Sequence, residues 1–187
     1  MIESAKATDQ AGASVERGAV LAELLAMRGR FEVECVGPDG KVKWRDVIEN
    51  LVTTVGKNDL LDKYLAGSGY TATVRMGLKG AGTAVVGDTQ ASHGAWLEQG
   101  LANAPTYTGN RPTPSWSAAS GGSKATSAAV SFAITSSGTV AGVFINNGGS
   151  ATKDDTTGVL YSAGDFSGGS KVVANLDTLN VTYTASA

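Results

Sequence analysis

The sequence predicts a mainly β protein of the α+β kind: a two-layer antiparallel β-sandwich with one or two helices and an N-terminal helical arm. Two observations support this prediction. Apolar and polar residues alternate in several short runs, which is the pattern of strands that bury one face. Glycine is frequent, at 25 of 187 residues, and only 17% of the residues are charged. That composition favours short strands and tight turns over a helical bundle.

The length of 187 residues fits one domain with its own core and a small appendage. We expect an N-terminal arm with a helix over residues 1–29 and a single β-rich domain over residues 30–187. Within that domain the sequence predicts a hairpin and helix at 30–67, a loop-rich middle at 68–126, and C-terminal strands at 127–187.

Residues 14–28, SVERGAVLAELLAMR, predict the helix of the arm, with Ser14 as its N-cap and Gly29 just past its end. The stretch 19–27 contains one charged residue, Glu23, so most of the helix circumference is apolar. A helix of this kind is buried on most sides, either under the sheet of its own chain or against another subunit. We predict contact with another subunit.

A β-hairpin is expected next, because RFEVECV and KVKWRDVI flank the turn sequence GPDG at 37–40. Glu32 and Glu34 should face solvent opposite Lys43 and Arg45. The buried side of the first strand should be formed by Phe31, Val33 and Cys35.

Residues 49–66, ENLVTTVGKNDLLDKYLA, predict a second helix packed on the sheet. Gly56 and the pair Asn58-Asp59 are candidates for a break in it. After this helix, TATVRMGLKG predicts a strand and GAGTAVVGDT predicts a loop or a short edge strand. The apolar side of the helix should carry Leu51, Val55, Leu61, Tyr64 and Leu65.

The stretch 88–122 has weak periodicity. We expect one helical turn in DTQASHGAWLEQG. The following NAPTYTGNRPTPSWSAASGG is rich in Pro, Gly, Ser and Thr and predicts an extended surface connection anchored by Tyr107 and Trp116. The C-terminal runs alternate clearly, and the short polar connection at 136–138 predicts a hairpin between two of them. The inward positions of these strands should include Val130, Phe132, Ile134, Leu179, Val181 and Tyr183.

Charge and cysteine content limit the classes of partner. The net charge is −2 and no basic run is present, which argues against nucleic-acid binding. No apolar stretch reaches the roughly 18 residues that a membrane-spanning helix requires, and the first residues lack the pattern of a secretory signal. The single cysteine, Cys35, cannot form an intrachain disulfide and is expected to be a packed thiol. We therefore expect folding in a reducing cytoplasm.

The side-chain inventory offers no catalytic or metal centre. With one histidine, His93, and one cysteine far away in the chain, a zinc or iron site lacks ligands. Asp88 precedes His93 closely, but no G-x-S-x-G motif frames a nucleophile. Gly77, Gly80 and Gly82 match no phosphate-loop spacing and predict turns. We expect no catalytic, cofactor-binding or metal-binding residues, no cofactor and no enzymatic activity.

Two other groups of residues suggest weaker alternatives. Four aspartates have no calcium-loop spacing, so solvated acidic turns are favoured over a calcium site. Three tryptophans suggest either a sugar-binding platform or packing anchors, and anchors are the commoner case. These residues are Asp154, Asp155, Asp165 and Asp177, and Trp44, Trp96 and Trp116.

Several segments after residue 29 carry a resemblance to a known family: GRFEVECVGPDGKVKWRDVIENLVTTVGKNDLLDKYLAGS, DTQASHGAW, NRPTPSWSAAS, SKATSAAVSFAIT, GVLYSAGDFSGG and DTLNVTYTASA. Together they resemble small virion structural proteins of tailed bacteriophages and prophages. The resemblance covers most of the chain after residue 29 and includes no catalytic motif. It implies a capsid decoration, or cement, protein that stabilises the head by bridging capsid subunits.

The same resemblance implies that the partners are the major capsid protein and other copies of this chain, without nucleic acid or membrane. It places the protein in the virion, associated with the capsid, and in the host cytoplasm before assembly. One alternative is a structural protein of the tail, collar or head-tail junction. Another is a receptor- or glycan-binding virion module that uses the tryptophans and the loops of 88–116. A small hydrolase centred on His93 is the third.

Overall fold

The computed structural model describes residues 27–65 and 73–187, and the structural statements below refer to these residues. The protein is mainly β, as predicted, with one helix in the described part. The helix is α2 (Thr54–Leu65). The strands are β1 (Arg28–Val36), β2 (Val42–Val52), β3 (Val74–Lys79), β4 (Glu98–Gln99), β5 (Ser123–Ala125), β6 (Val130–Ala133), β7 (Gly138–Val140), β8 (Gly142–Asn147), β9 (Val159–Asp165), β10 (Lys171–Val173) and β11 (Thr178–Ser186).

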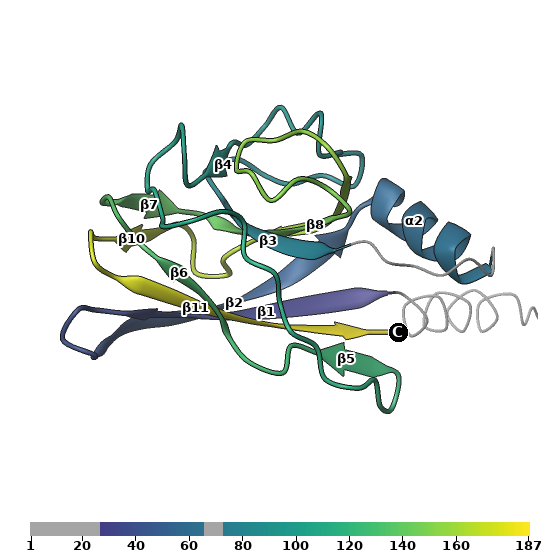
Figure 1. Ribbon diagram of the computed structural model, residues 1–187, viewed down its shortest axis with the longest axis horizontal. Helices are drawn as coiled ribbons and strands as arrows, with labels where there is room; N and C mark the ends of the chain where they lie inside the picture. The colour runs from purple at the N-terminus through teal and green to yellow at the C-terminus, as the bar shows by residue number, and fades with distance from the viewer. Residues whose placement is uncertain (1–26, 66–72) are drawn as a thin grey trace, which may run out of the picture.

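The strands form a nine-stranded antiparallel sheet in the order β4-β3-β8-β9-β2-β1-β11-β5, with β6 also paired to β11, and a two-stranded sheet of β10 and β7. Strand β2 joins the two halves of the large sheet. Its residues 42–50 pair with β1, while Leu51 and Val52 pair with β9. Figure 1 shows one side of the sheet, with β1 and β11, in the lower part of the molecule and the other side, with β3 and β8, across its middle. Because the pairing is one continuous path through β2, the arrangement as two separate layers stays a prediction.

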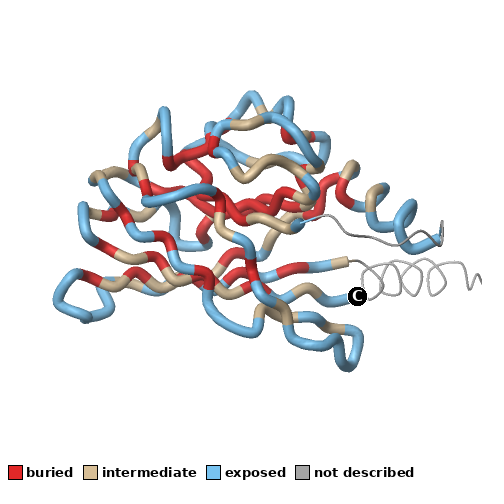
Figure 2. The backbone as a smooth tube through the Cα atoms, viewed as in Figure 1, coloured by how far each residue is buried: buried red, intermediate tan, exposed pale blue. Residues whose placement is uncertain are grey.

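The main core lies between these two sides of the sheet, and Figure 2 shows buried backbone concentrated there. Alternation along β1 and β11 places every second side chain in this core, as the sequence predicts. The core includes Phe31, Val33, Cys35, Met76, Leu78, Phe132, Ile134, Val143, Ile145, Leu179, Val181 and Tyr183. A smaller cluster contains Trp96, Phe144, Leu160 and Ala163.

The predicted hairpin at 37–40 is confirmed. The amide of Gly40 donates to the carbonyl of Gly37 at 2.9 Å, and Gly40 has a φ of 76°. Arg45 lies opposite Glu34 as expected. The expected position of Lys43 opposite the glutamates is wrong, because a bulge between Cys35 and Val36 shifts the register.

The predicted start of the second helix at residue 49 is wrong. Strand β2 continues to Val52, and α2 begins at Thr54. Thr53 is the N-cap, because its Oγ1 accepts a hydrogen bond from the amide of Gly56 at 3.0 Å. Gly56 does not break the helix; a Cβ there would lie 2.4 Å from the carbonyl oxygen of Tyr161, so glycine permits close packing on β9.

The expected apolar contact side of the helix is wrong, because Gly56 is the only residue of α2 that is buried. Leu51 belongs to β2, and Val55 is half-buried. The remaining side chains of the expected contact side are exposed, and they are Leu61, Tyr64 and Leu65.

The strand at Val74–Lys79 is confirmed, and the stretch 80–89 is a loop without an edge strand. Tyr107 and Trp116 anchor the long middle connection through isolated bridges to Ile134 and Thr126, as predicted. The hairpin predicted at 136–138 is wrong. Strand β6 pairs with β11, whereas β7 pairs with β10, so the chain leaves one sheet for the other at this connection.

The helix predicted for residues 14–28 falls mostly on residues 14–26, which lie outside the described part of the chain. From Arg28 the chain is already in β1, so Gly29 is a strand residue and not the end of a helix. A Cβ on Gly29 would lie 2.1 Å from the hydroxyl of Tyr183 and 2.5 Å from Oδ1 of Asn50. Glycine is required there because side chains from both neighbouring strands meet over its backbone.

Candidate docking surface

An open apolar groove of about 630 Å³ is lined by residues of α2, β5 and the C-terminus. These elements lie at the same end of the molecule in Figure 1. The walls of the groove come from segments that are far apart in the sequence. The first residues of the described chain, the helix and the loop before β5 all contribute. The lining includes Met27, Leu60, Val74, Pro114, Trp116, Ala119, Ile145, Tyr161, Tyr183 and Ala185, and Lys124 is the one charged side chain among the described residues that line it.

Aromatic side chains join this groove to the core. Tyr183 packs against Phe31 with ring centroids 4.5 Å apart, and Trp116 meets Tyr183 edge-on at 6.2 Å. Asn50 donates a hydrogen bond to the hydroxyl of Tyr183 at 3.2 Å. Burial raises the pKa of Tyr161 and of Tyr183. Both phenols are therefore neutral at physiological pH, and the groove is an apolar extension of the core.

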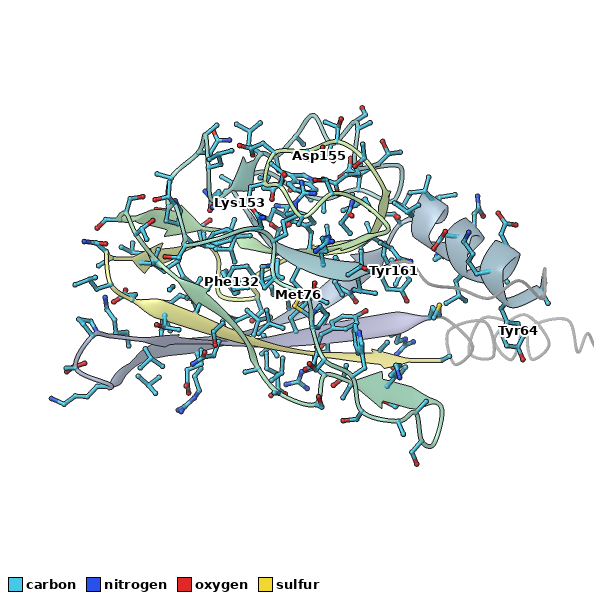
Figure 3. All side chains as sticks on the ribbon, in the orientation of Figure 1. Tyr64, Met76, Phe132, Lys153, Asp155 and Tyr161 are labelled. Atoms are coloured by element: carbon cyan, nitrogen blue, oxygen red, sulfur yellow. The ribbon has the colours of Figure 1, made fainter. Side chains whose placement is uncertain are left out.

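Helix α2 adds exposed apolar side chains beside the groove. Leu61 is 52% exposed, Tyr64 83% and Leu65 75%. A second opening links the helix to the groove wall, and its lining is half apolar or aromatic and half polar: Leu60, Tyr64 and Tyr161 with Asp59, Lys63 and Asn147. Figure 3 shows Tyr64 at the far end of α2 and Tyr161 near its base. We refer to the groove and the three exposed side chains of α2 together as the apolar end.

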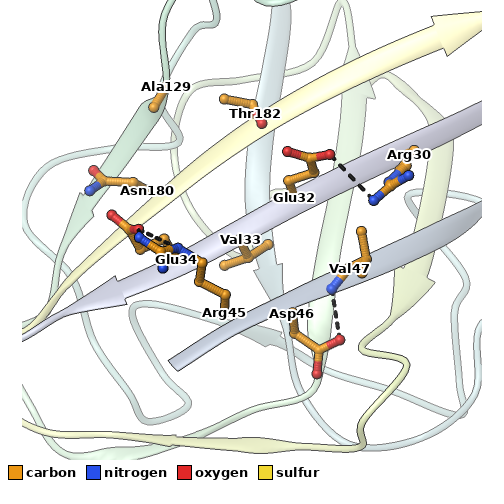
Figure 4. Close-up of a pocket in the computed structure, with 10 residues that line it drawn as sticks. All are labelled: Arg30, Glu32, Val33, Glu34, Arg45, Asp46, Val47, Ala129, Asn180 and Thr182. Carbon is orange, nitrogen blue, oxygen red and sulfur yellow. Dashed lines mark hydrogen bonds and ion pairs between the residues drawn. The ribbon is translucent and has the colours of Figure 1, made fainter. Parts of the chain in front are cut away.

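The outer face of the β2-β1-β11 part of the sheet has the opposite character. It carries a shallow hollow lined mainly by charged and polar side chains of both signs (Figure 4). Arg30 lies 3.4 Å from Glu32, and Arg45 lies 2.5 Å from Glu34. These pairs largely neutralise one another, so this face has no single-sign field that would attract a charged polymer.

Asp46 borders this charged face and fastens the β9–β10 connection to β2. Its carboxylate lies 2.7 Å from Nζ of Lys171, and it accepts a hydrogen bond from Oγ of Ser167 at 2.7 Å. Burial opposes ionisation of this carboxyl group. The hydrogen bonds from Lys171, Ser167 and the amide of Val47 outweigh burial and lower the pKa of Asp46 to about 2.

Buried charges hold the loops at the other side of the sheet, where Figure 3 places Lys153 and Asp155. Arg111 and Glu98 form a two-point ion pair, with Nε to Oε1 at 2.8 Å, and their side chains are 0% and 3% exposed. Arg111 also donates to the carbonyl of Asp155 at 2.7 Å. Lys153 donates to the carbonyl of Tyr107 at 2.7 Å. These contacts fix loop geometry and leave the charges inaccessible to a ligand.

The predicted candidates for catalysis are not assembled into a dyad. Asp88 accepts hydrogen bonds from the indole of Trp96 at 2.9 Å and from the amide of Val85 at 3.0 Å. The ring of His93 stacks on Trp96 with centroids 4.0 Å apart, and its Nδ1 lies 3.0 Å from the carbonyl oxygen of Trp96. His93 is thus used in a turn contact.

Cys35 is buried and forms a small network with Asp177. The thiol lies 3.6 Å from Oδ2 of Asp177, and Nζ of Lys43 lies 2.8 Å from the same oxygen. Burial, followed by the negative charge of Asp177, raises the pKa of Cys35 to about 12. A thiol with this pKa is a poor nucleophile at neutral pH.

The acidic residues and glycines considered in the sequence have separate structural roles. Asp177 binds Lys43, and Asp165 binds the buried Lys79. Within residues 27–65 and 73–187, no three His, Cys, Asp or Glu side chains are grouped to hold a metal ion. Gly77 is not in a turn as predicted. It lies inside β3, where a Cβ would come 2.2 Å from the ring of Phe144.

The tryptophans pack on different partners. Trp44 meets Phe166 edge-on at 5.5 Å, and Trp116 lies beside Tyr183. Trp96 is 1% exposed, so it cannot offer a ring face to a sugar. Trp44 and Trp116 are half-buried, and Trp116 also lines the groove, so the glycan-binding alternative stays a prediction.

No protein-family model, no curated protein and no solved structure matches this chain. In the described part of the chain, no helix has both the length and the apolar character to cross a membrane. The apolar end is the feature that sequence reasoning missed. Its only sequence signal was the apolar group of Leu61, Tyr64 and Leu65 on a helix, which we expected to face the sheet.

Proposed function

We propose that this protein is a structural component of a tailed-bacteriophage virion, and specifically a capsid decoration protein that bridges capsid subunits. The observation that carries the proposal is the apolar end: an apolar groove to which α2 contributes Leu60, together with Leu61, Tyr64 and Leu65, which are all exposed on the same helix. Contiguous exposed apolar surface is typical of protein-protein contact sites. The proposed role is non-catalytic, and it agrees with the use of Asp88 and His93 in contacts with Trp96 and with the burial of Cys35.

The size of the exposed surface fits a contact that is made many times. Full burial of one large apolar side chain stabilises a complex by about 1.5–3 kcal/mol. Covering the exposed parts of Leu61, Tyr64 and Leu65 therefore contributes on the order of 3–6 kcal/mol. One micromolar contact requires about 8 kcal/mol. A single copy with this surface alone would bind weakly, whereas several linked copies on a repeating shell would bind firmly.

Copy number in purified particles tests the proposal. A decoration protein should approach the copy number of the major capsid protein, as measured by quantitative mass spectrometry against labelled peptide standards. A few copies per particle would favour the tail, collar or head-tail junction. Absence of the protein from particles would refute a virion role.

A pair of matched variants tests whether the apolar end makes the contact. Leu65→Ser removes a side chain that is 75% exposed from α2, and Leu101→Ser removes one that is 56% exposed from the loop after β4. We expect Leu65→Ser to lower occupancy on particles severalfold and Leu101→Ser to leave it unchanged. Equal losses would show that the apolar end is not the contact surface. Circular dichroism on both variants checks that the fold is intact.

A further inference from the structure

The walls of the groove are built from backbone that is already paired within the protein. Strand β5 pairs with β11, and β3 pairs with β8. Beside these strands, the amide of Ala187 donates to the carbonyl of Gly122 at 3.0 Å, and the amide of Gly148 donates to the carbonyl of Thr73 at 3.1 Å. The groove therefore offers a ligand few free backbone donors or acceptors.

Polar side chains in the lining are bound within the protein as well. Oγ of Ser123 donates to the carbonyl of Ala185 at 3.0 Å, and Nδ2 of Asn147 donates to the carboxylate of Asp59 at 2.9 Å. Among the buried side-chain nitrogen and oxygen atoms of the described lining, only Oδ1 of Asn147 lacks a partner. The surface that a ligand meets in the groove is therefore mainly apolar.

This pairing favours one class of ligand. An extended peptide brings an amide and a carbonyl at every residue, and burying these groups without partners costs free energy. A hydrocarbon chain brings no such groups, and each CH₂ group that leaves water favours binding. The walls thus favour a hydrocarbon chain over an extended peptide.

The groove also has one positive charge at its border. Lys124 on β5 is exposed and is the one charged side chain among the described residues of the lining. Its Nζ donates to the carbonyl of Ser117 at 2.9 Å, and an ammonium group has further donors for a ligand. From α2 the lining receives only Leu60, and Figure 1 shows α2 and β5 on opposite sides of the end of β11. The lining is thus apolar at α2 and cationic at β5.

We propose that the groove binds a single-chain anionic amphiphile, namely a free long-chain fatty acid. The carboxylate of the ligand pairs with Lys124, and its chain covers Trp116 and Tyr161 toward Leu60. Sites for small molecules have volumes of about 300–1,000 Å³ and apolar walls with a few polar groups. The groove, with its volume of about 630 Å³ and a single charged border residue, has these properties.

A chain-length series on the full-length protein tests the hydrocarbon part of the proposal. Isothermal titration calorimetry would compare octanoate, decanoate and dodecanoate below the concentrations at which they form micelles. Affinity should rise about two- to fourfold for each added CH₂ group, because each group buries further apolar surface. Affinity that does not change with chain length would overturn the proposal.

A charge variant tests the carboxylate contact. Lys124→Gln should weaken dodecanoate binding roughly fivefold, which corresponds to about 1 kcal/mol for one ion pair, and should leave dodecanol binding unchanged. The matched control is Lys41→Gln, at a side chain that is 84% exposed beside the 37–40 turn, and it should change neither ligand. Equal dodecanoate affinity in the Lys124→Gln variant and the original chain would overturn the assigned position of the carboxylate.

A blocking variant tests the location. Ala119 is an exposed residue of the lining, so Ala119→Trp should fill part of the groove and weaken dodecanoate binding at least tenfold. Ala129→Trp places the same ring on the charged face of the sheet and should leave binding unchanged. Circular dichroism checks the fold of both variants. Equal losses in the two variants would show that the ligand does not bind in the groove.

Absence of binding by the full-length protein at every chain length would also overturn the proposal. The groove would then belong to another occupant, such as a helix of a protein partner or residues 1–26 of the chain itself. The proposal is independent of the virion role, because Leu61, Tyr64 and Leu65 are not part of the groove lining. Full occupancy on particles without fatty-acid binding would refute only the ligand, and fatty-acid binding by a protein absent from particles would refute only the virion role.

Discussion

The buried ion pair of Arg111 and Glu98 gives the sharpest stability prediction. Replacing Arg111 with methionine removes the charge and keeps most of the side-chain volume. It leaves the Glu98 carboxylate, which is 3% exposed, without its cation. Breaking a buried pair in this way costs about 3–5 kcal/mol, because the remaining charge stays desolvated. The carbonyls of Ser150 and Asp155 also lose donors from Arg111.

A matched variant provides the control. Arg45→Met breaks the pair with Glu34, in which the arginine side chain is 70% exposed, and exposed pairs contribute less than about 1 kcal/mol. Urea unfolding followed by tryptophan fluorescence should separate the two variants clearly. For a chain of this length, Arg111→Met should lower the Tm by about 6–20 °C at fixed protein concentration. If Arg111→Met cost no more than Arg45→Met, the pair would not be a stabilising feature of the fold.

The double variant Glu98→Leu/Arg111→Met separates the charge effect from the loss of packing. Removing both charges eliminates the unpaired carboxylate, so the double variant should be more stable than Arg111→Met alone. The amide of Asp154, which donates to Glu98 at 2.9 Å, would lose its acceptor and limit the recovery. A double variant less stable than Arg111→Met would contradict the assignment of the cost to the buried charge.

Four other measurements test separate parts of the structure. Because the pKa of Asp46 is lowered to about 2, its carboxylate contributes roughly 2 kcal/mol to the free energy of unfolding. This contribution is present above pH 4 and is lost as the pH falls toward 2. Asp46→Asn should remove this acid dependence of stability, and an unchanged dependence on pH would contradict the role given to Asp46. Gly56→Ala should destabilise the protein by about 1–3 kcal/mol despite better helix propensity, because of the contact with Tyr161; a rise in Tm would disprove the close approach. Cys35 should resist thiol reagents at pH 8 and react on unfolding, whereas fast labelling of the native protein would show that it is accessible. Deleting residues 1–28 should weaken association with particles more than it lowers the Tm, and the reverse would count against an intermolecular arm.

Local signals predicted the parts of the fold that are themselves local. The GPDG turn at 37–40 and the alternation along β1 and β11 depend on neighbouring residues, so the sequence contains the information directly. Lys43, at the bulge, donates instead to Asp177, a residue more than one hundred positions away, and a local pattern does not contain that contact. The connection at 136–138 has the composition of a hairpin turn, but strand partners are chosen by long-range packing.

The start of α2 had a correct local signal in the sequence, but a competing pattern led to the wrong prediction. Thr53 is a suitable N-cap, but the apolar residues of ENLVTT also fit a helical period, which led to a start at 49. In the structure these residues extend β2, because Leu51 and Val52 pair with β9. The candidate docking surface had no comparable signal, since its groove is assembled from segments between Met27 and Ala187.

The energetics of α2 connect the fold to the proposed contact. A helix of 12 residues is marginal in water by itself and normally depends on packing of its apolar side. Here Gly56 is its one buried residue, while Leu61, Tyr64 and Leu65 face outward. The N-cap at Thr53 and the contact of Gly56 with β9 hold the first turn, and Asn147 of β8 donates a hydrogen bond to Asp59 in the second turn at 2.9 Å. The side chains of residues 60–65 are exposed. Covering the apolar end would therefore stabilise α2 as well as the complex, so that helix order and partner binding are coupled.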